Sequence, residues 1–390
     1  MKNRFLLTAL SFVMIFMSCS TDDTADVNIT VDNGGGNNSN TINLSGLYTE
    51  DLTLDPNNSY TINGSLIMGA GTTLTVPAGM TVNALAAGSD VYLAISQGAR
   101  IVANGTAANP IVFTSNATNP SAGDWGGLIL LGRAPVNSVT GTATATSEIA
   151  SLPYGGNVAN DDSGILRYVR VEYSGGSADG QSENNGISFY GVGNGTTVDY
   201  VQAFEGLDDG IEFFGGTVNV SNAIVVNAQD DSIDWTEGYT GTITNAYVKH
   251  GATHDKGIEA DGYNTDIGNN SNPLYFSAPT VNNLTIVGLG SANSSEAVRL
   301  RAGTQGIFNN VYLQGYGEGF DLDGDNGANP TGDGVVNDLL QVTDVTFNDI
   351  TLNVKNDTDV AFTDADFFTG GGNGTATDVA TWGAGWAVGL

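Results

Sequence analysis

The sequence predicts an all-β protein: a right-handed parallel β-helix, or solenoid, with loop insertions at its turns and an aromatic C-terminal cap. From residue 43 onward no helical period appears, and short runs of β-branched and aromatic residues alternate with Gly, Asn, Asp and Ser. One phrase, a polar residue followed by apolar residues two positions apart, begins at Asp199, Asn222 and Asn245, so 23 residues separate successive copies. A propeller blade or a leucine-rich repeat would have a different period and signature. The seven copies of this phrase begin at Arg167, Asp199, Asn222, Asn245, Asn283, Asn310 and Asp344.

A second phrase runs in step with the first, and the two together predict one β-helix turn per repeat. It is centred on the apolar residues Ile187, Ile211, Ile233, Ile258, Val298 and Phe320. Most successive centres are separated by about the same number of residues as the copies of the first phrase. The longer separations indicate loops inserted at one corner. A single turn cannot bury its own apolar face, so we expect the stability to arise between neighbouring turns.

Alternation along the second phrase predicts which side chains leave the core. If the apolar centre points inward, the next residue points outward, and stacking places equivalent residues about 4.8 Å apart. The residues after the centre form a central column: Ser188, Glu212, Asp234, Glu259, Arg299 and Asp321. A leading column lies two residues before the centre: Asn185, Asp209, Asp231, Lys256, Glu296 and Glu318. A trailing column lies two residues after the central column: Tyr190, Phe214, Thr236, Asp261, Arg301 and Asp323.

The charge composition of the chain makes these columns the candidate for a binding site. The chain has 42 acidic and 11 basic residues and a formal net charge of −31, which excludes nucleic acid and anionic membrane faces as partners. Three carboxylates on successive turns repel one another unless a cation, a raised pKa or a basic side chain offsets them. Scarce basic residues gather beside the stripe, including His254. We therefore predict a ligand-binding site at Glu212, Asp234, Lys256, Glu259, Arg299 and Arg301.

The N-terminus has the pattern of a bacterial lipoprotein signal. Lys2 and Arg4 precede an apolar run over residues 5–17, which is too short to span a bilayer. Cys19 is the only cysteine, so it can form no disulfide within the chain, and it stands where an acylated residue is expected. We predict a signal peptide over residues 1–18, an acylated Cys19 with a flexible tether over residues 19–42, and a single β-helix domain over residues 43–390.

Three phrases extend this interpretation by resemblance. They are residues 103–114, the stretch from Asp124 to Leu131, and the stretch from Asp208 to Thr217. Together with the acidic residues after Cys19, they resemble a family of Bacteroidetes β-helix surface lipoproteins over residues 60–390. The resemblance implies an outer-membrane, lipid-anchored protein that faces the cell exterior. Its expected role is non-catalytic binding, on a β-helix flank, of a glycan, a cation or an outer-membrane protein partner.

A partial resemblance to polygalacturonases supports an alternative, the cleavage of acidic glycans by a hydrolase or lyase. It rests on Asp209, on the pair Asp230 and Asp231, and on Arg299 and Arg301. The resemblance implies that Asp209 and Asp230 activate water, that Asp231 is the general acid, and that the two arginines hold a uronate carboxylate. The sequence departs from that family in lacking its Gly-His-Gly motif, in having Arg301 in place of a lysine, and in having Leu207-Asp208-Asp209 in place of Asn-Thr-Asp.

The remaining candidates concern metals and aromatic side chains. Asp321, Asp323 and Asp325 alternate like the ligands of a calcium loop, and calcium is the cofactor that the sequence suggests most strongly. His250 and His254 suggest zinc more weakly, because no third ligand is implied. We expect Trp382 and Trp386 to cover the open last turn, since an uncovered edge invites pairing with another chain. We also expect five aromatic residues to face outward, where they could stack on sugars: Tyr190, Phe214, Tyr239, Tyr263 and Tyr316.

Overall fold

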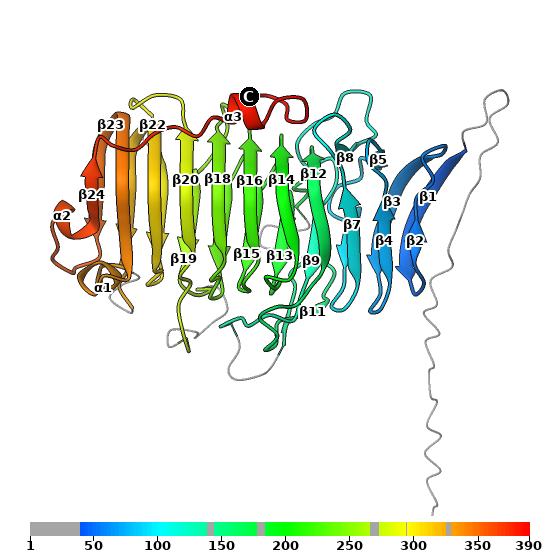
Figure 1. Cartoon of the computed structure of the whole chain (residues 1–390), viewed down its shortest axis with the longest axis horizontal. Helices are drawn as coiled ribbons and strands as arrows, with labels where there is room; N and C mark the ends of the chain where they lie inside the picture. Colours follow the sequence, from blue (N-terminus) through cyan, green and yellow to red (C-terminus); the bar gives the residue numbers. More distant parts are fainter. Residues whose placement is uncertain (1–39, 139–143, 178–183, 266–272, 294, 325–328) are drawn as a thin grey trace, which may run out of the picture.

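The computed structural model confirms the parallel β-helix. It describes residues 40–138, 144–177, 184–265, 273–293, 295–324 and 329–390. Twenty-two strands pair into one continuous parallel sheet that winds around a single core. Figure 1 shows the turns stacked side by side, from β1 (Thr41–Tyr48) at one end to β23 (Leu340–Asp357) and β24 (Phe368–Gly371) at the other. No helix among the described residues is long and apolar enough to cross a membrane.

The strands follow the period that the sequence predicts. The first turns contain β2 (Leu52–Thr53), β3 (Ser59–Met68), β4 (Thr73–Val76), β5 (Thr81–Ala84), β6 (Tyr92–Ile95), β7 (Arg100–Asn104), β8 (Ile111–Ser115) and β9 (Leu128–Leu131). The strands that carry copies of the first phrase are β12 (Gly164–Glu172), β14 (Thr197–Phe204), β16 (Asn219–Val226), β18 (Thr242–Lys249), β20 (Thr280–Val287) and β22 (Gly306–Asp323). The short strands of the second phrase are β13 (Ile187–Tyr190), β15 (Ile211–Phe214), β17 (Ile233–Thr236), β19 (Ile258–Asp261) and β21 (Glu296–Arg301).

A backbone bend explains the polar first residue in five of the seven copies of the first phrase; in the copies that begin at Arg167 and Asp199 the bend lies at the tyrosine that follows. The long strands turn a corner at residues with positive φ, a conformation that Asn and Asp tolerate better than most residues. The Asn side chains also form a ladder: the Asn283 amide donates to Asn245 at 2.9 Å, and that of Asn310 donates to Asn283 at 3.0 Å. The residues at this corner are Tyr168, Tyr200, Asn222, Asn245, Asn283, Asn310 and Asp344.

The five aromatic residues expected on the surface are buried, so that prediction is wrong. Tyr239 and Tyr316 belong to the core inside the coil, where Tyr239 stacks on Phe213 at a ring distance of 4.3 Å. Tyr190 and Phe214 do point out of the coil, but an insertion between β9 and β12 covers them. Tyr263, also buried, packs near Phe276. Alternation predicted the direction of Tyr190 and Phe214 but not the segment that covers them.

Two insertions form this covering layer. The one before β12 contains the paired strands β10 (Ala145–Thr146) and β11 (Pro153–Tyr154), and the other follows β19. The side chain of Asn137 joins them by donating to the backbone oxygens of Gly262 and Tyr275 at 2.9 and 2.5 Å. Tyr154 anchors the first insertion by donating to the buried carboxylate of Glu237 at 2.7 Å.

The C-terminal cap is aromatic, but its residues are phenylalanines. Phe367, at the end of α2 (Asp364–Phe367), is fully buried and meets Phe320 of the last turns at a ring distance of 5.2 Å. Phe362 and Phe368 pack beside it, and α1 (Gly332–Val336) contacts α2 and β23.

The expectation that Trp382 and Trp386 cover this end is wrong. Residues 374–390, which we name the C-terminal strap, run back along the flank of the coil and include α3 (Val379–Trp382) (Figure 1). Trp386 is buried there against Ile224, Val226 and Tyr168.

Candidate functional site

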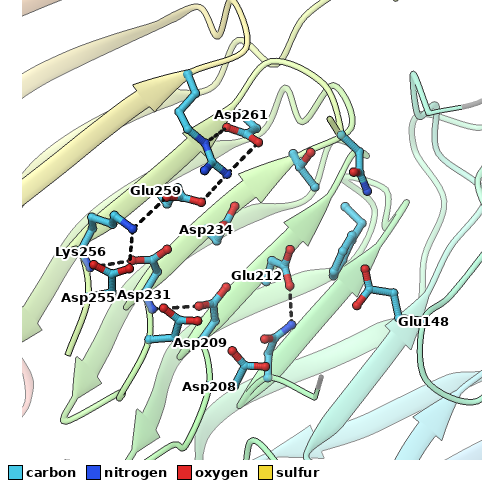
Figure 2. Close-up of a pocket in the computed structure, with 16 residues that line it drawn as sticks. Glu148, Asp208, Asp209, Glu212, Asp231, Asp234, Asp255, Lys256, Glu259 and Asp261 are labelled. Atoms are coloured by element: carbon cyan, nitrogen blue, oxygen red, sulfur yellow. Dashed lines mark hydrogen bonds and ion pairs between the residues drawn. The ribbon is translucent and has the colours of Figure 1, made fainter. Parts of the chain in front are cut away.

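The face built by the short strands carries a polar cleft of about 330 Å³. Strand pairing confirms the predicted columns, since Glu212 pairs with Asp234, Asp234 with Glu259, and Glu259 with Arg299 on successive turns. Figure 2 shows carboxylates from successive strands pointing into one hollow. The lining residues are Glu148, Asn185, Asp208, Asp209, Glu212, Phe214, Asp230, Asp231, Asp234, Thr236, Asp255, Lys256, Glu259, Asp261, Asn264 and Arg301.

The cleft is strongly acidic, because its lining has ten carboxyl groups and only two basic side chains. Burial raises the pKa of Asp209, Glu212, Asp231 and Asp234 well above their usual values, and nearby carboxylates raise each further. Both effects act in the same direction, since a buried anion is poorly solvated and like charges repel. The cleft therefore favours protons or other cations.

The two basic side chains of the cleft already have carboxylate partners. Lys256 contacts Asp255 at 2.5 Å and Glu259 at 3.1 Å. Arg301 donates to both oxygens of Asp261, at 2.6 and 3.0 Å, and also contacts Glu259. Burial lowers the pKa of both groups, but neighbouring carboxylates outweigh it and raise the pKa of each: chiefly Asp231 and Glu259 for Lys256, and Asp261 and Glu259 for Arg301.

Most of the residues predicted from the sequence meet in this cleft. Asp209, Asp230 and Asp231 lie together with Glu212, Asp234, Lys256, Glu259 and Arg301. Arg299 is not among the lining residues; its guanidinium pairs with Asp323, to which Nε donates at 3.0 Å.

The leading column is also tied to the backbone of the next turn. The carboxylate of Asp209 accepts from the backbone N–H of Asp231 at 2.9 Å, and that of Asp231 accepts from the N–H of Lys256 at 2.6 Å. These aspartates therefore have a structural role in addition to any role in ligand binding or catalysis.

The carboxylates are close enough to share cations. Four groups of three each place one oxygen per residue within 4.8 Å of the others: Asp208, Asp209 and Asp230; Asp209, Glu212 and Asp234; Asp230, Asp231 and Asp255; and Asp231, Asp234 and Glu259. Clustered carboxylate oxygens are the ligands that calcium prefers. The chemistry of this donor set therefore fits Ca²⁺.

The predicted calcium loop differs from the cleft, because two of its carboxylates already have basic partners. Asp321 contacts Lys355 at 3.4 Å and Asp323 pairs with Arg299, while Asp325 lies outside the described residues. Asp321 also comes within 4.8 Å of Glu296 and Glu318, a set that the loop pattern did not predict.

At the predicted zinc site, the ring nitrogens have protein partners. His250 contacts the hydroxyls of Ser232 and Tyr316 at 3.1 and 2.8 Å. His254 contacts the Asp255 backbone oxygen at 2.8 Å and the Asn293 amide at 2.9 Å.

Sequence reasoning missed several lining residues. Asp208 and Asp255 each stand one position before a member of the leading column, as the predicted Asp230 does, and that position could have been included for all turns. Thr236 and Asp261 were registered in the trailing column without a role. Glu148 and Asn264 come from the insertions, and no repeat signal could have placed them.

A comparison with protein families agrees with the fold. The family model described as Pectate-lyase like beta helix domain matches residues 46–387. Two solved structures with weak similarity to this chain are catalytic domains of variants of a GH87 alpha-1,3-glucanase in complex with tetrasaccharides, each with 12% sequence identity. Their TM-scores are 0.35 and 0.33, and the alignments cover 85% and 79% of this chain. The chain spans 64% and 65% of those domains, less than two thirds of their length. No curated protein gives a significant match.

Proposed function

This chain belongs to the pectate-lyase-like β-helix domain family, and on that premise we propose that its acidic cleft binds a divalent cation and, through it, an acidic glycan. The observation that carries the proposal is the set of ten carboxyl groups lining the cleft beside two basic side chains. Calcium offers six to eight coordination positions, so a cation held by three carboxylates keeps positions for a ligand. A uronate carboxylate suits those positions.

The ion pairs that Arg301 already forms favour a ligand bound through a cation over a ligand bound directly by the arginine. Direct binding of an anionic sugar is favoured by a basic group whose charge is not already balanced, and the charge of Arg301 is balanced by Asp261 and Glu259. Lys256 is engaged by Asp255 and Glu259 in the same way. An acidic glycan would therefore meet net negative charge in the cleft unless a cation neutralised it first.

Calorimetric titration tests the cation step. We expect Ca²⁺ to bind the purified protein, and Asp234→Asn to weaken binding because Asp234 belongs to two carboxylate groups. The control is Asp338→Asn, an exposed carboxylate at a positive φ that Asn tolerates. Calcium binding that is equal in both variants would contradict the assignment of the cation to the cleft.

The glycan step is tested by titrating oligogalacturonate with Ca²⁺ or with chelator. We expect binding only when Ca²⁺ is present. Binding that persists in chelator would show direct recognition of the sugar and refute the bridging cation.

A second candidate is hydrolysis of a glycan, favoured by the meeting of Asp209, Asp230 and Asp231 in one cleft. Burial and the neighbouring Glu259 raise the pKa of Asp231, which is the direction that a general acid requires. Reducing-sugar release from polygalacturonate and from neutral α-glucans, with Asp231→Asn as the inactive control, tests it. If no substrate is cleaved, the binding function stands alone.

We also infer an outer-membrane location with the β-helix facing the cell exterior, where a protein partner could join it. The support is the basic, apolar and Cys19 pattern of the first residues. Cys19→Ala should abolish labelling with radioactive palmitate, and protease added to intact cells should degrade the wild-type protein. Protection from protease would argue for a periplasmic position.

A further inference from the structure

The trailing column differs from the other two columns at Thr236. This residue is only 7% exposed, and its hydroxyl oxygen is buried without a hydrogen-bond partner in the described structure. Thr236 nevertheless belongs to the lining of the cleft. Leaving a buried hydroxyl without a partner costs free energy, and such groups in native proteins call for an explanation. A hydroxyl that lacks a protein partner and lies in a cleft wall is suited to a partner on the ligand.

Within the cleft, the trailing column carries less net negative charge than the other two columns. On the preceding turn Thr236 pairs with Phe214, which lines the same cleft and stacks on Tyr190 at 3.9 Å. On the following turn the trailing column continues with Asp261, whose charge is matched by Arg301. The four carboxylate groups described above are drawn from the central and leading columns and from residues adjoining the leading column. A cation is therefore attracted to that side, while Arg301 repels it from the trailing side.

The insertions complete the wall beside the trailing column. Asn264 lines the cleft, and its amide nitrogen donates to Glu237 at 3.4 Å. Glu237 is the buried carboxylate that also accepts from Tyr154, so one group holds both insertions in place. The wall thus combines an aromatic ring, a hydroxyl and an amide, the mixture of apolar and neutral polar groups that suits a sugar ring.

We propose that Thr236, with Phe214 and Asn264 beside it, forms a sugar-hydroxyl subsite next to the cation site. The inference rests on the proposed function and specifies its ligand: a saccharide with a carboxylate at the cation and a ring hydroxyl at Thr236. Thr236 Oγ1 donates to or accepts from that hydroxyl. Thr236 is the specificity-determining residue of this subsite, because a sugar without the hydroxyl leaves its buried oxygen unpartnered.

The test compares Thr236→Val, which keeps the shape and removes the hydroxyl, with Thr236→Ser, which keeps the hydroxyl. Thr75→Val on β4 (Thr73–Val76), which is not among the lining residues, is the matched control. Calorimetry measures Ca²⁺ affinity first and then trigalacturonate affinity in saturating Ca²⁺. We expect Thr236→Val to weaken trigalacturonate binding about tenfold with unchanged Ca²⁺ affinity. Thr236→Ser and Thr75→Val should bind like the wild type.

Each contrary result has a distinct meaning. Trigalacturonate binding by Thr236→Val at wild-type affinity overturns the subsite and leaves the proposed function intact. A loss of Ca²⁺ affinity in Thr236→Val also overturns it, because Thr236 would then be a metal ligand. If the wild type binds Ca²⁺ but no trigalacturonate, both the subsite and the glycan part of the proposed function fail.

Discussion

The Asp231 carboxylate accepts a hydrogen bond from the backbone N–H of Lys256, one turn further along the coil, at 2.6 Å. Asp209 repeats the arrangement with the N–H of Asp231 at 2.9 Å. Each aspartate thus joins its own turn to the next one and also lines the cleft. Stability and ligand chemistry are therefore coupled in the leading column.

This coupling predicts different effects for two substitutions of Asp231. Asp231→Ala leaves the buried N–H of Lys256 without its acceptor and should lower the free energy of unfolding by about 1–3 kcal/mol. Asp231→Asn keeps an acceptor oxygen and removes a charge that Glu259 and Asp230 repel, so it should cost little or stabilise the fold. Urea denaturation monitored by circular dichroism measures both. Equal losses for Ala and Asn would refute the structural role of this hydrogen bond.

The pKa shifts predict an unusual pH dependence of stability. The pKa of Asp209, Glu212, Asp231 and Asp234 is raised, chiefly by burial and then by neighbouring carboxylates. The folded protein therefore takes up protons at a pH where the unfolded chain is ionised. Their contribution favours folding at lower pH and is lost as pH rises through the folded pKa values.

His250 acts in the opposite direction. Burial and then His254 lower its pKa from 6.5 to about 3, so its contribution is lost as pH falls below 6.5. With four carboxyls against one imidazole, Tm in chelator should be higher at about pH 5.5 than at about pH 8. Calcium should raise Tm mainly at the higher pH. Glu212→Gln combined with Asp234→Asn should flatten both trends, and a Tm that falls steadily on acidification would contradict the prediction.

Arg301 is predicted to stabilise the cleft more than a surface arginine does. Its partners Asp261 and Glu259 are nearly buried, and removing one side of such a pair leaves uncompensated charge. Arg301→Ala should lower the free energy of unfolding by about 3 kcal/mol. The control Arg100→Ala, which breaks the more exposed pair with Asp162, should cost less than about 1 kcal/mol. Similar losses in the free energy of unfolding for Arg301→Ala and Arg100→Ala would refute this prediction.

The C-terminal strap should contribute strongly to stability. Trp386 is 1% exposed outside the main core, its backbone oxygen accepts from Arg170 at 2.6 Å, and the Gln202 amide pairs with both backbone groups of Val388. Trp386→Ala should therefore cost about 3–5 kcal/mol. Trp382→Ala, at a less buried position, should cost less. Thermal and urea denaturation measure the two values, and a negligible loss for Trp386→Ala would show that the strap is only loosely held.

The sequence alone was enough to derive the β-helix, the period and the three columns. Strand alternation and the stacking of one turn on the next depend only on local patterns that repeat, and the pairing of Glu212 with Asp234 and Asp234 with Glu259 follows from them. The predicted carboxylates consequently meet in one cleft. In five of the seven copies the polar first residue of the first phrase also has a local cause, its positive φ at the corner of the turn.

Only the tertiary structure decided which side chains are covered. The insertion that brings Glu148 to the cleft and the strap that carries Trp386 away from the last turn both depend on contacts outside the repeat. Arg170 and Trp386 are 216 residues apart in the chain, and Asn137 and Tyr275 are 138 apart. Such contacts depend on shape and packing between segments that share no period, so no periodic signal in the sequence reports them.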